Sequence, residues 1–296
     1  MFLIALMGLF SSSFIPVFAA LATEKETRYG RAIGEFWTAA SIGYATSTLI
    51  GGFLFQFFDP TYLYVLGAFF GYSGILAVSV LTKQGLTITK PRIRPQGYWS
   101  LLNQRNVLIL CGVSILALVS ASSFNSFFTI YLVDSLNGSR LMAGIAATAT
   151  TAFGAIAFRV VGPLNDKIGR KPLFLFGAIG YAVYFTTIFL VTNALVVTIL
   201  WTLPIYPFIQ ASAAALMSDY TSIADRGKGL GILESAIGLG GGLGPLIGGV
   251  IADATQLQSV ILFALAAALG SAALSQLFLS DPTRRKQSST VRVAQT

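Results

Sequence analysis

Long apolar runs separated by short polar segments dominate the chain. Nine of them reach the roughly 20 residues that a helix needs to cross a hydrocarbon core of about 30 Å. They lie at residues 1–22, 32–57, 60–82, 107–134, 140–164, 172–192, 195–218, 230–252 and 256–280. The runs lack period-two alternation, and a helix satisfies its own backbone polar groups in lipid. The pattern therefore predicts an all-α membrane protein with nine transmembrane helices.

Residues 1–22 allow a second interpretation as a secretory signal, because Ala20, Leu21 and Ala22 follow the apolar stretch. The stretch lacks the basic n-region of such signals. It also leads directly into a basic loop, so a membrane span is the better prediction.

The composition supports a membrane-embedded chain, since 55% of its residues are hydrophobic, 10% are charged and the mean hydropathy is +0.76. Its 19 basic residues give a net charge of +8, and 17 of them lie in alternate polar segments or the C-terminal tail. Basic residues near span ends stay in the cytoplasm. We therefore expect a cytoplasmic C-terminus and an outward-facing Met1. The charge reports topology and contact with anionic lipids of the bilayer rather than nucleic-acid binding.

Enzymatic chemistry finds little support in the residues. The chain has no His, and its one Cys, Cys111, lies inside an apolar run. It also lacks a phosphate-binding loop and a metal-ligand cluster. We therefore predict no catalytic residues, no metal and no cofactor, and a protein that is not an enzyme.

An internal repeat connects two of the apolar runs at an offset of 197 residues. Gly30-x-x-x-Gly34 matches Gly227-x-x-x-Gly231, and Leu49-Ile50-Gly51-Gly52 matches Leu246-Ile247-Gly248-Gly249. Such a repeat is typical of transporter folds built from related halves. We expect residues 30–52 and 227–249 to occupy equivalent positions.

A charged segment, residues 162–171, interrupts the apolar pattern with the sequence Gly-Pro-Leu-Asn-Asp-Lys-Ile-Gly-Arg-Lys. Gly162 and Gly169 allow close backbone approach and a tight reversal. Asp166 offers an acceptor for helix N-terminal amides, and Arg170 and Lys171 offer donors to carboxylate or phosphate. Together these residues suit an electrostatic contact between helix ends.

This segment resembles the G-x-L-x-D-(R/K)-x-G-R-(R/K) signature of the major facilitator superfamily of membrane transporters, and every fixed position is matched. We call residues 162–171 the signature segment. The resemblance implies a helical bundle of two six-helix halves, in which the nine spans correspond to the fourth through twelfth helices. The first three would then be missing from the sequence.

The resemblance also implies a domain organisation. Residues 1–82 would form a partial N-terminal bundle of three transmembrane helices, and residues 83–106 a cytoplasmic linker. Residues 107–280 would form the C-terminal six-helix bundle, and residues 281–296 a cytoplasmic tail.

The signature segment is expected, from the resemblance, to clamp one half against the other at the cytoplasmic face. By pseudo-symmetry, Asp166 would face the N-terminal end of the helix that starts near Gly30, and Arg170 would reach Asp219. The alternative is that these charges only fix topology, which is the better interpretation of Lys171. The predicted gate comprises Gly162, Asp166, Gly169, Arg170, Lys171 and Asp219.

Arg159, Glu35 and Glu234 lie inside predicted spans, where a charge is costly and therefore suggests function. Arg159 could pair with Asp219 or Glu234, or extend to the lipid headgroups. Glu35 and Glu234 are candidates for a proton or ion coupling site, although polar residues of a cytoplasmic gate would look the same.

A solute pathway requires polar or aromatic side chains that face inward from several helices. The candidates are Asn125, Phe128, Tyr131, Trp201, Tyr206 and Gln210, joined by Tyr44 and Ser47. Each could equally face a neighbouring helix or lipid. They include no acidic residue, which disfavours a cationic substrate.

The sequence as a whole predicts a permease in the plasma (inner) membrane that moves a small solute by alternating access, with a proton or another ion as the coupling species. The alternatives are a transport-incompetent remnant and a membrane receptor that does not transport its ligand.

Overall fold

The computed structural model describes residues 29–54, 60–83 and 97–281, and within them the chain is helical without strands. The predicted span 1–22 and most of the predicted linker and tail lie outside these residues. The helices are α2 (Tyr29–Leu54), α3 (Pro60–Lys83), α4 (Tyr98–Leu102), α5 (Arg105–Asn125), α6 (Phe128–Ile130), the π-helix η1 (Tyr131–Ser135), α7 (Arg140–Ile168), α8 (Arg170–Leu190), α9 (Ala194–Trp201), α10 (Tyr206–Tyr220), α11 (Arg226–Ala254) and α12 (Leu257–Phe278).

Six segments of the described chain are long and apolar enough to cross a membrane: Arg105–Ser135, Arg140–Ile168, Arg170–Leu190, Ala194–Tyr220, Arg226–Ala254 and Leu257–Phe278. They confirm the last six predicted spans to within four residues at each end. Helices α2 and α3 lie where two further spans were predicted. The total of nine spans stays a prediction.

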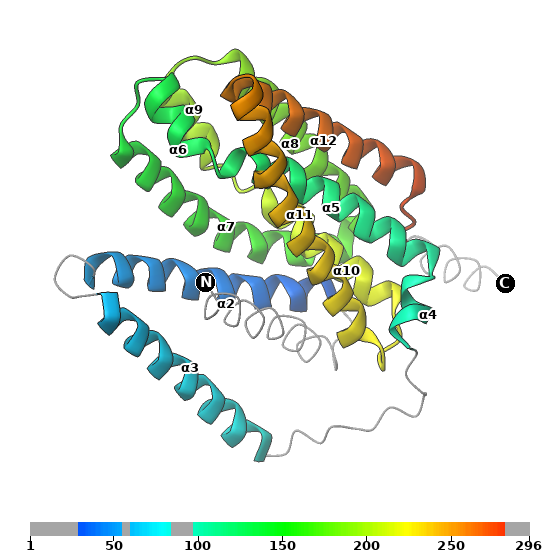
Figure 1. Cartoon of the computed structure of the whole chain (residues 1–296). Coiled ribbons are helices and arrows are strands. Elements are labelled where there is room, and N and C mark those ends of the chain that lie inside the picture. Colours follow the sequence, from blue (N-terminus) through cyan, green and yellow to red (C-terminus); the bar gives the residue numbers. More distant parts are fainter. Residues whose placement is uncertain (1–28, 55–59, 84–96, 282–296) are drawn as a thin grey trace.

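Helix α2 runs antiparallel to α7 and connects the N-terminal part of the chain to the bundle (Figure 1). The contact is closest at Gly34, where a Cβ atom would lie 2.6 Å from the Gly162 Cα atom. One turn later, the Thr38 hydroxyl donates to the Ala155 carbonyl over 3.3 Å. Helix α3 diverges from α2 and from the bundle (Figure 1).

Helix α5 lies at the centre of the bundle, between α11 and α12 (Figure 1). Gly240, Gly244 and Gly248 of α11 face backbone atoms of α5 so closely that a Cβ atom at any of them would collide. On the other side, Ser120 and Ser271 donate to carbonyls across the α5–α12 contact, over 2.6 and 2.9 Å. Small residues and hydroxyl donors of this kind hold membrane helices together.

Two of the six membrane segments are interrupted. Residues 126–127 separate α5 from α6, and residues 202–205, which include Pro204, separate α9 from α10. Aromatic side chains from both segments meet between the breaks, where Phe128 stacks on Trp201 with centroids 3.6 Å apart. Interrupted helices commonly border the binding sites of transporters, so these breaks direct attention to the space beside them.

Candidate functional site

The signature segment contains almost no loop. The apolar pattern predicts one span that ends at residue 164 and another that begins at 172, but α7 continues to Ile168 and α8 begins at Arg170. Gly169 alone joins them, at φ 105°, a conformation that favours glycine. The expected charged turn is therefore the joined ends of two helices, and its polar side chains are fixed by helical geometry.

Asp166 contacts the first described turn of α2. Its Oδ2 atom accepts a hydrogen bond from the Arg31 backbone N–H over 2.9 Å. Amides of the first helical turn lack partners within their own helix and carry the positive end of the helix dipole, so they favour a carboxylate. The structure thus contains the contact that pseudo-symmetry predicted, and it lies one turn from the Gly34–Gly162 approach.

Arg170 lies between two carboxylates and is nearly buried. Its Nη2 atom is 2.9 Å from Asp166 Oδ1, and its Nε atom is 3.3 Å from Asp219 Oδ2 at the end of α10. The Asp219 contact is an ion pair rather than an aligned hydrogen bond. Only 5% of the Arg170 side chain is exposed. Removing the Arg170 charge would take a shared cation from two carboxylates in a poorly solvated place, which is destabilising.

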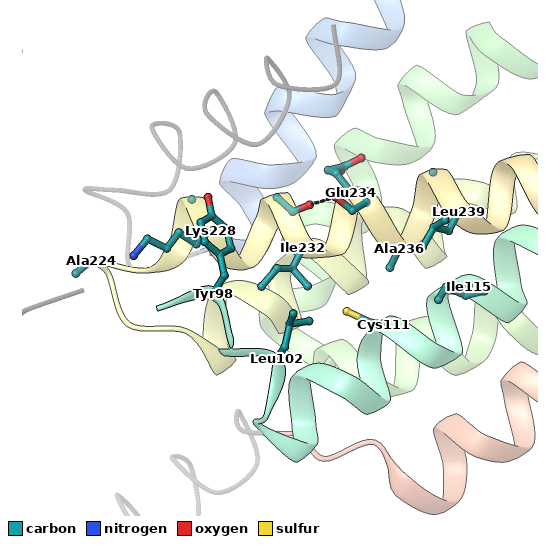
Figure 2. Close-up of a pocket in the computed structure, with 14 residues that line it drawn as sticks. Tyr98, Leu102, Cys111, Ile115, Ala224, Lys228, Ile232, Glu234, Ala236 and Leu239 are labelled. Atoms are coloured by element: carbon teal, nitrogen blue, oxygen red, sulfur yellow. Dashed lines mark hydrogen bonds between the residues drawn. The ribbon is translucent and has the colours of Figure 1, made fainter. Parts of the chain in front are cut away.

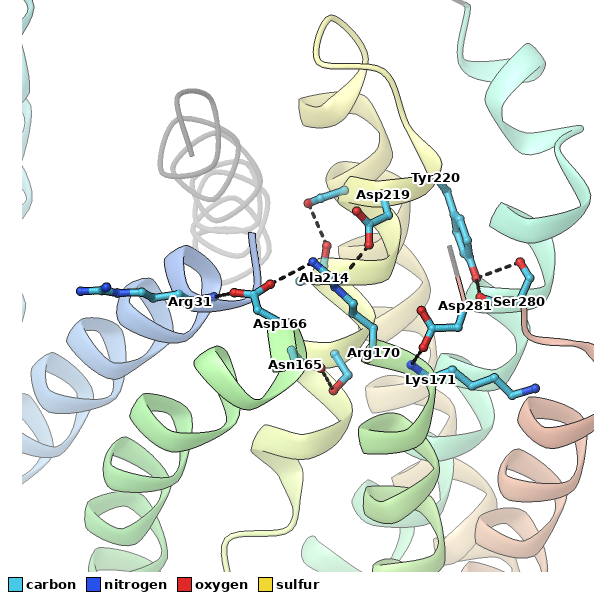
Figure 3. A network of polar contacts seen from close by, with 12 residues as sticks. Arg31, Asn165, Asp166, Arg170, Lys171, Ala214, Asp219, Tyr220, Ser280 and Asp281 are labelled. Carbon is cyan, nitrogen blue, oxygen red and sulfur yellow. Dashed lines mark hydrogen bonds and ion pairs between the residues drawn. The ribbon is translucent and has the colours of Figure 1, made fainter. Parts of the chain in front are cut away.

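A second set of contacts ties the signature segment to the chain beyond α12 (Figure 3). The Asp281 carboxylate accepts from the Lys171 backbone N–H over 3.3 Å, and the Lys171 ammonium donates to the Gln276 carbonyl over 2.8 Å. The Tyr220 hydroxyl donates to the Ser280 carbonyl. Lys171, interpreted as a topology signal, therefore also bridges two helix ends.

Sequence reasoning missed Asp281, Tyr220 and a buried pair in which Ser212 donates to the Asn165 side-chain carbonyl over 2.8 Å. Asn165 occupies a variable position of the signature. Asp281 comes directly after the last apolar run, where the pattern predicts the start of the tail. No local sequence pattern indicates that the chain contacts α8 at that point.

A cavity of about 410 Å³, here called the aromatic cavity, lies between α2, α5, α7 and α10. It adjoins both helix breaks, because Asn125 ends α5 and Tyr206 begins α10. A methyl group at Gly154 would overlap the Tyr206 hydroxyl, so that glycine leaves room for the ring. None of the described residues that line the cavity is charged. Its lining is Trp37, Ala40, Ser41, Tyr44, Asn125, Thr150, Thr151, Phe158, Tyr206 and Gln210.

The structure divides the predicted pathway residues into two groups. Asn125, Tyr206 and Gln210 line the aromatic cavity together with Tyr44. Tyr131 and Trp201 instead belong to a packed aromatic cluster around Phe124, with Tyr131 only 2% exposed. The side chain of Ser47 lies outside the described part of the structure. Bulky aromatic rings at a helix break can fill space between helices. The sequence does not distinguish an aromatic ring that packs in this way from one that contacts the solute.

A larger cavity of about 1030 Å³ lies along the first half of α11 and is called here the α11 cavity. Figure 2 shows Glu234 among the lining residues of α11, with Cys111 and Ile115 of α5 below it. The Lys228 ammonium lies 5.7 Å from the Tyr98 ring centroid at one end. Glu234 is partly buried, and the structure shows no ion pair for it among the described residues.

The other two coupling candidates lie away from both cavities. Glu35 is exposed and pairs with Arg31 of its own helix over 2.8 Å. Arg159 is exposed and forms no ion pair with Asp219 or Glu234 within the described chain, so neither suggested pairing is present. Arg159 borders a groove on another face of the α2–α7 pair. Within residues 29–54, 60–83 and 97–281, no cluster of His, Cys, Asp or Glu is arranged to hold a metal ion.

Comparison with known proteins gives the family. The sequence model described as Major Facilitator Superfamily matches residues 110–295. The staphyloferrin B transporter of Staphylococcus aureus is 30% identical over 162 residues, which cover 53% of this chain and 39% of that protein. The multidrug resistance protein MdtG of Proteus mirabilis is 34% identical over 128 residues, covering 43% and 31%. The class H tetracycline resistance protein of Pasteurella multocida is 28% identical over 187 residues, covering 61% and 44%.

The aligned part of the chain spans less than half the length of each of these three relatives. The family match extends over more than half of the chain and includes the whole signature segment. Six apolar segments of membrane-spanning length, within the part of the chain that the structure describes, accompany that match. The chain is therefore an integral membrane protein that belongs to the Major Facilitator Superfamily of transporters.

Proposed function

We propose that the protein is a secondary transporter that moves a small solute across the plasma membrane by alternating access. The carrying observation is the signature segment, which links α2 to the C-terminal bundle through Asp166 and Arg170. The aromatic cavity lies between the same two parts of the chain. Alternating access requires two bundles that rock about a central site. Such motion needs a contact that can open and a cavity that lies between the bundles.

The solute would bind in the aromatic cavity between Asn125, Tyr206 and Gln210. Amide and hydroxyl groups give the cavity donors and acceptors, and Trp37 and Phe158 give it apolar faces. The absence of charge in the described lining favours an uncharged solute or an uncharged part of a larger one. Relatives named for tetracycline resistance, multidrug resistance, citrate export and staphyloferrin B supply the first solutes to test.

The orientation and domain organisation remain those of the sequence prediction. Contacts of Arg170 with Asp219 and of Lys171 with Gln276 gather the α7–α8 junction and the ends of α10 and α12 at one end of the bundle. We propose that this end is cytoplasmic, because it collects basic residues. The described helices α2, α3 and those of the C-terminal bundle would then correspond to the fifth through twelfth helices of the family fold.

Glu234 is the acidic residue best placed to couple transport to a proton or another ion. It lines the α11 cavity on a membrane-spanning helix, whereas Glu35 is exposed and already paired. A carboxylate in such a position can change its charge or exchange a cation as access alternates.

The test is uptake by vesicles that contain the purified full chain, with the solutes named above and with or without a pH gradient. We expect saturable uptake of at least one unmodified solute, accelerated by the gradient. Glu234→Gln should abolish the acceleration but retain solute exchange, whereas Asp253→Asn, an exposed carboxylate at the far end of α11, should behave as wild type.

Binding of a solute without uptake or exchange would favour a receptor, and neither binding nor uptake of any solute would favour a transport-incompetent remnant. Acceleration that survives in Glu234→Gln would reject the coupling role alone and leave transport intact.

A further inference from the structure

The α2–α7 pair has a second hollow, distinct from the aromatic cavity. Thr38, Ile42, Ala45 and Thr46 of α2 face Ala152, Ala155, Ile156, Arg159 and Val160 of α7 across a groove of about 460 Å³. Residues three and four apart repeat along both helices, so one face of each helix forms the groove. This face differs from the one that carries Trp37, Ser41 and Tyr44 into the aromatic cavity.

The walls of the groove are those of a surface in contact with lipid. Ile42, Ile156 and Val160 are 55%, 64% and 58% exposed. All three belong to the long helices α2 and α7, and α7 is a membrane-spanning segment. Exposed aliphatic side chains on such a segment contact acyl chains rather than water.

Arg159 is the single charged residue among the nine described residues that line the groove. It lies seven residues before Asp166, which places its Cα atom about 10 Å deeper along α7 at about 1.5 Å per residue. Within the described residues it has no carboxylate neighbour in an ion pair. A guanidinium at this depth is unfavourable without a counter-charge.

The hydroxyl groups of the groove do not meet this need. The Thr38 hydroxyl donates to the Gly34 and Ala155 carbonyls, and the Thr46 hydroxyl donates to the Ile42 carbonyl. These contacts satisfy the helices themselves. The guanidinium therefore remains as the group that can recruit a ligand, and a planar donor with several N–H groups suits a phosphate.

We propose that this groove binds one phospholipid, whose phosphate pairs with Arg159 and whose acyl chain lies along Ile42, Ala45 and Ile156. The long arginine side chain allows the guanidinium to approach the headgroup while its methylene stem stays in the apolar groove. Basic pockets between membrane helices bind anionic headgroups in this way. The bound lipid spans the contact between α2 and α7.

The proposal is tested by native mass spectrometry of the full chain in detergent, titrated with phosphatidylglycerol. We expect wild type to retain one lipid, and Arg159→Gln to bind it at least about tenfold more weakly, because a charge-assisted contact is lost. Arg159→Lys should recover part of the affinity. Arg140→Gln, which removes an exposed arginine at the other end of α7, is the matched control and should bind as wild type.

Two further measurements separate the parts of the proposal. Ala152→Trp keeps Arg159 but fills the groove, and it should weaken lipid binding as well. Equal lipid binding by Arg159→Gln and wild type would overturn the proposal, and so would undiminished binding by Ala152→Trp. Displacement of the lipid by excess inorganic phosphate would assign the site to a soluble anion and would also overturn it.

Discussion

The two sides of the signature segment are built differently. Towards α2, the described contacts include the hydrogen bond from the Arg31 amide to Asp166 and the close approach of Gly34 and Gly162. Towards the bundle the segment offers the ion pair of Arg170 with Asp219, the buried Asn165–Ser212 bond and the two Lys171 contacts. Among the described contacts, side-chain ion pairs and a buried hydrogen bond hold the segment in the C-terminal bundle, whereas a backbone amide and two glycines form the contact with α2. Under the proposed alternating access, the contacts with α2 separate first.

We expect the largest loss of stability when the contacts between the signature segment and the C-terminal bundle are removed. Arg170→Met keeps an unbranched stem but removes the guanidinium, so Asp166 and Asp219 lose their shared cation, which should lower the free energy of unfolding by about 3–5 kcal/mol. Thermal or denaturant unfolding of the purified protein in detergent measures the loss. Lys167→Met, which removes an exposed charge from the same segment, should change it by less than about 0.5 kcal/mol. Similar values for the two variants would mean that the bundle-side ion pairs do not hold the segment.

An intermediate effect is expected where the α2 side is broken. Gly34→Ala would place a Cβ atom 2.6 Å from both Gly162 Cα and the Phe158 carbonyl oxygen, and backbone atoms cannot yield as a side chain does. Overpacking of this kind costs about 1–3 kcal/mol. The same unfolding measurement applies.

Gly43 provides the control on the same helix, because a Cβ atom there meets nothing within 4 Å. Gly43→Ala should be neutral or stabilising, since alanine is the better helix former by about 1 kcal/mol. If both substitutions changed stability equally, the close α2–α7 approach would not be a determinant of the fold.

The smallest effect is expected at the connection to the chain after α12. Asp281→Ala removes the carboxylate that accepts from the Lys171 amide at the start of α8, a change comparable to losing a helix cap, about 0.5–2 kcal/mol. Asp253→Ala, at an exposed carboxylate near the end of α11, serves as the control. A loss as large as that of Arg170→Met would show that the anchor lies at residue 281 rather than in the buried ion pairs.

The sequence predicted what depends on periodicity and charge. The apolar runs predicted the last six spans, since length and hydropathy decide whether a helix can span a membrane. The contacts expected from pseudo-symmetry, of Asp166 with the start of α2 and of Arg170 with Asp219, are present in the structure. Their role in gating, like the twofold relation of residues 30–52 and 227–249, stays a prediction.

What the sequence could not predict depends on contacts between distant parts of the chain. Asp281 gains its place only because α12 ends beside α8, and Trp201 becomes a packing residue only because it meets Phe128 across two helix breaks. The same aromatic residue type lines the aromatic cavity at Tyr206. Residue type alone does not show whether an aromatic side chain packs or lines the cavity. The rotation of each helix within the bundle decides this.

A single residue, Gly169, joins α7 and α8, so the connection between them has no spare length. Surface loops absorb insertions and relative motion because their length is adjustable, but here one extra residue would turn every following side chain of α8 by about 100° around its axis. Arg170 and Lys171 would lose their targets together. The number of residues in this junction therefore decides whether Arg170 meets Asp166 and Asp219 and whether the Lys171 amide meets Asp281.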